Sequence, residues 1–68
     1  MIELKIKQAI LEKEEPFSLA DLYSYFEDKG ITNKKLILEV FNFLFDAGLI
    51  VLADASVPKY KSILTEVN

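Results

Sequence analysis

The segment from residue 33 to residue 47 constrains the fold of this chain most strongly, because from Lys35 onward its polar side chains are confined to one narrow stripe. At about 100° per residue, four polar side chains of a helix there fall on a single stripe, namely Lys35, Glu39, Asn42 and Asp46. From Leu36 onward, all positions of the segment outside this stripe are apolar. A helix that lays one face on a small core usually has a wider polar side. We therefore expect that the rest of the chain covers both flanks of this helix, or that some of its apolar surface contacts a partner.

The ends of this helix are marked by residues that commonly cap helices. Thr32 carries a hydroxyl that can accept a backbone N–H at a helix start, so we expect it to be the N-cap. Gly48 follows the helix, and glycine readily adopts the left-handed conformation in which helices end.

Two shorter helices are expected earlier in the chain. Residues 19–29 follow Ser18, which together with Asp21 has the spacing of a capping box, and they end before Gly30. Residues 2–13 carry apolar side chains at helical spacing. The alternation of apolar residues at positions 2, 4 and 6 also fits a strand start, but the helix-forming run that follows favours a helix.

Two β-rich runs follow the third helix and predict a short hairpin. They cover residues 49–53 and 59–64, with a loop from Asp54 to Pro58 between them. Pro58 has no N–H to donate to a ladder, so it belongs at the loop edge or at the start of the second strand. A short extended segment is also expected at Phe17.

The composition points to one small globular domain, residues 1–68, without catalytic chemistry. The chain has 51% hydrophobic residues and contains neither cysteine nor histidine. It therefore lacks thiolate and imidazole, which are the commonest metal ligands and general bases. We expect no enzyme activity, no cofactor, no metal and no small-molecule substrate. No apolar run reaches the ~18 residues that cross a bilayer, and the first residues do not resemble a signal peptide, so we expect a cytoplasmic protein that does not contact membranes.

The order of the expected elements resembles the winged helix-turn-helix superfamily over nearly the whole chain. The sequence Phe-Asp-Ala-Gly-Leu-Ile at residues 45–50 is similar to the family's transition from the recognition helix to the wing. The resemblance implies a mainly α fold with a small β-hairpin, in which three helices are followed by a two- or three-stranded wing.

The resemblance further implies a protein that binds double-stranded DNA, in the manner of a transcriptional regulator. The helix at 33–47 would then enter the major groove, and the wing would contact the DNA backbone or the minor groove. The residues that this places at nucleic acid are Thr32, Asn33, Lys34, Lys35, Asn42, Lys59, Tyr60 and Lys61. Tyr60 could stack on a base, although core packing is the commoner role of such a tyrosine.

The charges of the chain argue against DNA binding. The formal net charge is −3, and all eight basic residues are lysines, which cannot grip guanine bidentately as arginine does. Glu39 and Asp46 on the polar stripe repel phosphates. The alternative is a module for protein interaction or dimerisation that does not bind DNA and whose contact is the surplus apolar surface of the third helix. The residues that we assign to this interface are Leu38, Phe43 and Phe45.

Overall fold

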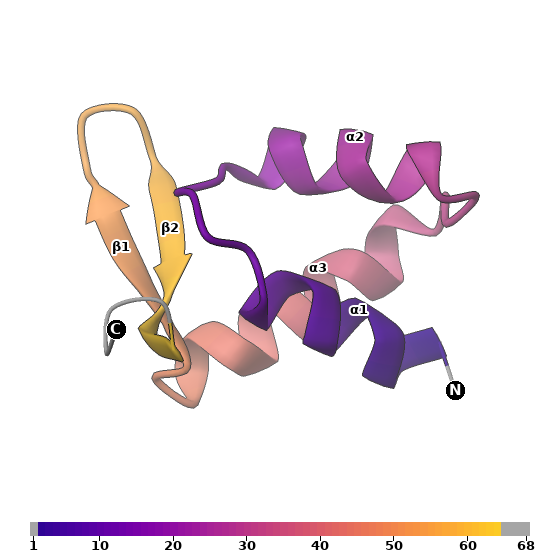
Figure 1. The fold of residues 1–68 in the computed structure, drawn as a ribbon, viewed down its shortest axis with the longest axis horizontal. Coiled ribbons are helices and arrows are strands. Elements are labelled where there is room, and N and C mark those ends of the chain that lie inside the picture. The colour runs from indigo at the N-terminus through magenta and orange to yellow at the C-terminus, as the bar shows by residue number, and fades with distance from the viewer. Residues whose placement is uncertain (1, 65–68) are drawn as a thin grey trace.

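The computed structural model describes residues 2–64, which fold into three helices and a two-stranded antiparallel hairpin (Figure 1). In chain order the elements are α1 (Ile2–Leu11), α2 (Leu19–Asp28), α3 (Lys34–Asp46), β1 (Ile50–Asp54) and β2 (Lys59–Ser62). The predicted fold class, mainly helical with a small hairpin, is confirmed, and the arrangement is consistent with a winged helix. The expected domain of residues 1–68 extends beyond the described residues at both ends.

Residues at the start of α2 form the predicted capping box. The Ser18 hydroxyl accepts a hydrogen bond from the Asp21 N–H at 3.1 Å, and the Asp21 carboxylate accepts one from the Ser18 N–H at 3.0 Å. The second of these bonds lowers the pKa of the Asp21 carboxyl, because it favours the charged form. Two N–H groups that a helix start leaves without a backbone partner are thereby satisfied.

The start of α3 differs from the prediction by one residue. Asn33, rather than Thr32, is the N-cap, and its Oδ1 accepts a hydrogen bond from the Leu36 N–H at 3.1 Å. An N-cap side chain accepts from the N–H two or three residues further on. Because α3 begins at Lys34, Thr32 lies one residue too early to accept the Leu36 N–H. The predicted glycine positions are confirmed, since φ is 83° at Gly30 and 77° at Gly48.

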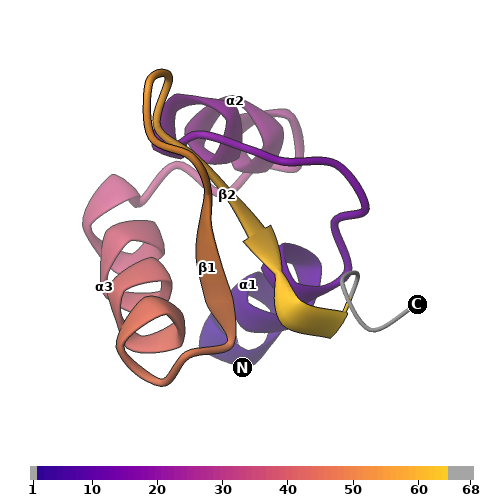
Figure 2. The ribbon, with the colours of Figure 1, turned by 90° about the vertical axis from the view of Figure 1, so that its left-hand side faces the viewer.

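The core lies on the inner side of α3. In Figure 2, α3 runs along one edge of the molecule, with α1, α2 and the hairpin all to one side of it. α3 supplies four of the buried apolar side chains, and α1, α2 and the hairpin pack around them. The buried apolar residues of the described chain are Ile6, Ile10, Phe17, Leu22, Phe26, Ile37, Val40, Phe41, Leu44 and Ile50.

The hairpin is joined to the segment between α1 and α2 by one antiparallel bridge. The Phe17 N–H donates to the Tyr60 carbonyl at 2.9 Å, and the Tyr60 N–H donates to the Phe17 carbonyl at 2.7 Å. Phe17 thus adds a one-residue third strand beside β2. This agrees with the extended segment predicted at Phe17 and with the predicted wing of two or three strands.

The second strand is shorter than predicted. It ends at Ser62 rather than at residue 64, although the Ile63 N–H still donates to the Leu49 carbonyl at 3.1 Å, in the register of the ladder. The Leu64 N–H donates to the Ser62 hydroxyl, also at 3.1 Å. This bond to the side chain of Ser62, rather than to β1, marks where the chain leaves the ladder. β1 carries a bulge between Leu52 and Asp54, where its pairing with β2 shifts by one residue.

We expect Ser18→Ala to lower the free energy of unfolding by about 1 kcal/mol, because the Asp21 N–H loses its acceptor. Urea denaturation followed by circular dichroism measures this change. Ser24→Ala is the matched control, since Ser24 is exposed within α2; alanine there should leave stability unchanged or raise it slightly. Equal denaturation midpoints for the two variants would contradict a stabilising capping box.

Candidate interaction surface

The outward side of α3 carries the polar stripe that the sequence predicts. All four of its side chains are exposed, and we call them the α3 stripe: Lys35, Glu39, Asn42 and Asp46. One charge on the stripe is positive and two are negative. The stripe therefore presents a weakly acidic surface along the helix.

One flank of α3 faces the hairpin and is apolar. The Tyr60 ring packs edge-on against Phe41, with 4.8 Å between centroids, and against Phe45, with 5.7 Å. Leu52 pairs with Tyr60 across the hairpin, so the two side chains lie on the same face of the sheet. Phe45 and Leu52 remain 44% and 48% exposed. We call this surface the wing-side patch; it consists of Leu38, Phe45, Leu52 and Tyr60.

The other flank of α3 faces α1 and forms a shallow apolar groove. Its floor comes from Leu4 on α1 and from Leu36 and Val40 on α3. Phe43 stands beside it with 60% of its surface exposed, and the Lys7 Nζ lies 5.9 Å from the centre of the Phe43 ring. We call this hollow the α1-side groove; it is lined by Glu3, Leu4, Lys7, Leu36, Glu39, Val40 and Phe43.

The three residues assigned to a partner interface are exposed but do not form one patch. Leu38 is 36% exposed and lies with Phe45 on the wing side of α3, whereas Phe43 lies on the α1 side. At about 100° per residue, Phe43 is roughly 140° to 160° around the helix from the other two. The α3 stripe separates the two apolar surfaces.

The predicted nucleic-acid residues at the start of α3 share one exposed turn. Thr32, Asn33, Lys34 and Lys35 are all exposed there. The Asn33 amide oxygen is occupied by its capping bond, and the Lys34 Nζ lies 5.5 Å from the Tyr23 ring centre on α2. Asn42 lies further along the helix, within the α3 stripe.

The structure does not place the wing lysines beside the α3 stripe. Side chains alternate along a strand, so Lys59 and Lys61 lie on the face of β2 opposite to Tyr60, which faces α3. The Lys59 Nζ instead lies 3.5 Å from the Asp21 carboxylate at the start of α2. The eight predicted nucleic-acid residues thus divide between surfaces that face different directions.

Several lysines lie over aromatic rings. The Lys13 Nζ lies 3.8 Å and the Lys29 Nζ 5.2 Å from the centre of the Tyr25 ring. Lys7 lies over the Phe43 ring, and Lys34 lies over the Tyr23 ring. Such contacts attract the ammonium to the electron-rich ring face. Four of the eight lysines therefore hold their charge close to the protein's own surface.

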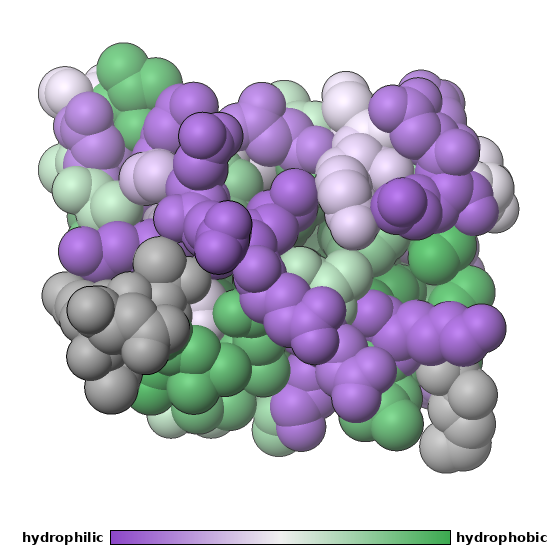
Figure 3. Space-filling model, viewed as in Figure 1, coloured by the Kyte–Doolittle hydropathy of each residue, from purple (hydrophilic) through white to green (hydrophobic). Residues whose placement is uncertain are grey.

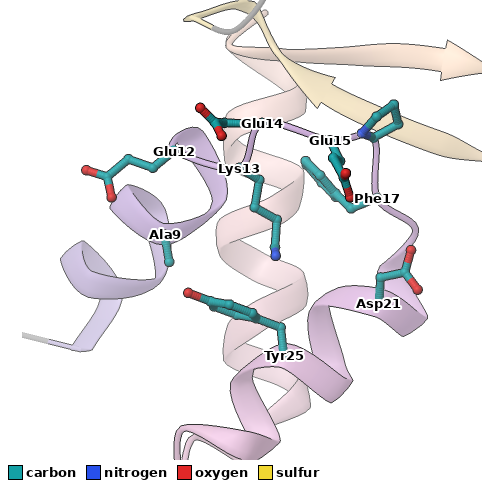
Figure 4. A pocket seen from close by; sticks show the side chains of 9 residues that line it. Ala9, Glu12, Lys13, Glu14, Glu15, Phe17, Asp21 and Tyr25 are labelled. Carbon is teal, nitrogen blue, oxygen red and sulfur yellow. The ribbon is translucent and has the colours of Figure 1, made fainter.

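The opposite face of the molecule is hydrophilic and acidic. Figure 3 shows a polar band across the face that α1, α2 and their connection form. A hollow of about 610 Å³ lies there, and Figure 4 shows Lys13 reaching toward Tyr25 across it. Its carboxylates come from Glu12, Glu14, Glu15 and Asp21. Residues 2–64 contain no group of three or more acidic residues arranged to hold a metal ion.

Comparisons with known protein families, with curated proteins and with solved structures find no match to this chain. Within residues 2–64, no helix combines the length and apolar character needed to cross a bilayer. The expected cytoplasmic location stays a prediction.

Among the exposed residues of the wing-side patch and the α1-side groove, sequence reasoning missed Leu4 and Leu52. Leu4 lies about 160° around α1 from the buried Ile6, and helical spacing alone could have placed it outside the core. Leu52 carries no such signal, because its exposure depends on how far the hairpin extends beyond α3.

We expect Tyr60→Ala to lower the free energy of unfolding by about 2 kcal/mol, since the half-buried ring packs on Phe41 and Phe45. Tyr60→Phe is the matched control and should change stability by less than about 0.5 kcal/mol, because it keeps the ring. Thermal and urea unfolding measure both variants. A loss of stability in Tyr60→Phe equal to that in Tyr60→Ala would assign the effect to the hydroxyl instead.

Proposed function

We propose that this chain is a winged-helix module for protein interaction and that the outward side of α3 is its contact surface. The observation that carries the proposal is the exposure of two phenylalanines on opposite flanks of α3, Phe43 at 60% and Phe45 at 44%. Burying a fully exposed phenylalanine contributes about 1.5–3 kcal/mol, and covering the exposed part of these two rings contributes about half of that for each, which favours association.

The same surface has the side chains that protein interfaces use. Aromatic side chains are enriched at such interfaces, and they are surrounded by polar groups that remain near water. On α3 the two apolar flanks lie on either side of the α3 stripe, which supplies charges and an amide for polar contacts. A partner that covers α3 would therefore meet both apolar anchors and hydrogen-bonding groups.

The charge on α3 supports a protein partner over DNA. A helix that enters the major groove approaches two rows of phosphates, and Glu39 and Asp46 would face them with only Lys35 on the same stripe to offset their charge. Lys59 and Lys61 lie on the far face of β2 and do not add positive charge beside the stripe.

A photoreactive amino acid at position 42 tests the proposal, because Asn42 lies in the middle of the exposed face. We expect irradiation of cells to which the chain is native to join it covalently to protein. The same group at position 14, on the acidic opposite face, is the control and should give much less adduct. A nucleic-acid adduct at position 42, or equal protein adducts at both positions, would refute the proposed contact surface.

One observation favours a second candidate function, the binding of double-stranded DNA by the start of α3. Thr32, Asn33, Lys34 and Lys35 are exposed together where the backbone N–H groups and the helix dipole favour an anion. This turn could contact phosphates without placing the rest of α3 in a groove.

The second candidate predicts weak DNA binding that depends on salt. Lys35→Ala should lower the affinity and reduce the slope of log affinity against log salt by about one unit. Lys5→Ala, which removes an exposed lysine on α1, is the control and should leave the slope unchanged. Fluorescence anisotropy with a labelled duplex measures both, and the absence of binding at low salt would exclude this candidate.

A further inference from the structure

The charges of the α3 stripe are ordered so that they complement a second copy of themselves. Along the helix, the midpoint between Lys35 and Asp46 falls between residues 40 and 41. The midpoint between Glu39 and Asn42 falls at the same place. When two such helices lie antiparallel about a two-fold axis through that centre, Lys35 of each copy faces Asp46 of the other. Glu39 of each copy likewise faces the Asn42 amide, which donates hydrogen bonds. This pairing therefore places opposite charges together at both ends of the contact, whereas the two Glu39 carboxylates lie near the two-fold axis, about 4.5 Å apart along the helix.

The apolar flanks share almost the same centre. In an antiparallel pair related by a two-fold axis, each flank of one helix meets the same flank of the other. On the wing side, Leu38 and Phe45 are centred between residues 41 and 42; on the α1 side, Leu36 and Phe43 are centred between residues 39 and 40. Each centre is one residue from that of the stripe, or about 1.5 Å along the helix. Leucine of one copy then lies beside phenylalanine of the other on both flanks.

We propose that the partner that covers α3 is a second copy of this chain, bound through an antiparallel α3–α3 contact with two-fold symmetry. This inference rests on the proposed function and names the partner of the same surface. The pair buries Leu38 and Phe45 against each other on the wing side, and Leu36 and Phe43 on the α1 side. Lys35 and Asp46 form an intermolecular ion pair at each end of the contact.

The arrangement of the fold leaves this contact open. α1, α2 and the hairpin all lie on the inner side of α3, so nothing in the described chain stands over the stripe (Figure 2). The contact is small, because α3 has 13 residues and is about 20 Å long. Stable interfaces bury roughly 800 Å² on each partner, so we expect a dimer that dissociates in the micromolar range.

Analytical ultracentrifugation from low micromolar to near-millimolar concentration tests the pairing through a charge exchange. We expect Lys35→Glu and Asp46→Lys each to raise the dissociation constant about tenfold, because each places like charges opposite each other twice in the dimer. The double variant K35E/D46K should restore the original dissociation constant. Lys5→Glu changes the net charge by the same amount as Lys35→Glu but lies on α1, and it should leave dimerisation unchanged. A monomer at every concentration, or a double variant weaker than both single variants, would overturn the pairing.

Two single cysteine variants test the register independently, since the chain itself has no cysteine. Asn42→Cys lies next to the two-fold axis and should form a disulfide-linked dimer under mild oxidation. Lys35→Cys lies about 16 Å from its symmetry mate along the helix and should not. Equal cross-linking of the two variants would overturn the register.

The photoreactive group at position 42 separates this inference from the proposed function. A protein adduct there with a mass other than twice that of the chain would reject the second copy while keeping the proposed function. No protein adduct there would reject both.

Discussion

The burial of the inner side of α3 is the constraint on which the rest of the structure depends. Ile37, Val40, Phe41 and Leu44 come from this one helix, and they are the side chains around which α1, α2 and the hairpin pack. A chain of 68 residues can build only one small core, so every other element has to lie on the same side of α3. The opposite side of α3 is left exposed as a consequence, together with the flanking residues that the core has no room to cover.

Tyr60 connects this core to the hairpin in two ways. Its backbone pairs with Phe17, and its ring packs on Phe41 and Phe45. Because neighbouring side chains alternate, fixing the ring of Tyr60 on α3 also turns Lys59 and Lys61 to the other face of β2. The contact that stabilises the wing therefore decides which charges lie beside α3. That placement supports the proposed protein contact of α3 over DNA binding.

Local patterns were sufficient for the helices, their glycine ends, the capping box at Ser18 and the exposed stripe, because each follows from spacing within one element. Two errors are local: the N-cap of α3 is Asn33 rather than Thr32, and the second strand ends earlier than predicted. The second strand stops at Ser62, where the Leu64 N–H donates to the Ser62 hydroxyl instead of to β1. Helical spacing could have separated Phe43 from Phe45, but which of them α1 or the wing would cover depends on packing. The division of the predicted nucleic-acid residues likewise required the strand pairing.

The lysines stacked on rings have a consequence for how the molecule meets others in a crowded solution. Lys7, Lys13, Lys29 and Lys34 are drawn toward Phe43, Tyr25 and Tyr23, while the carboxylates around Glu14 and Glu15 extend into water. Approaching macromolecules therefore first encounter negative potential over the α1–α2 side. A polyanion that approaches this side meets these carboxylates first, so the less charged outward side of α3 presents the smaller electrostatic barrier to it.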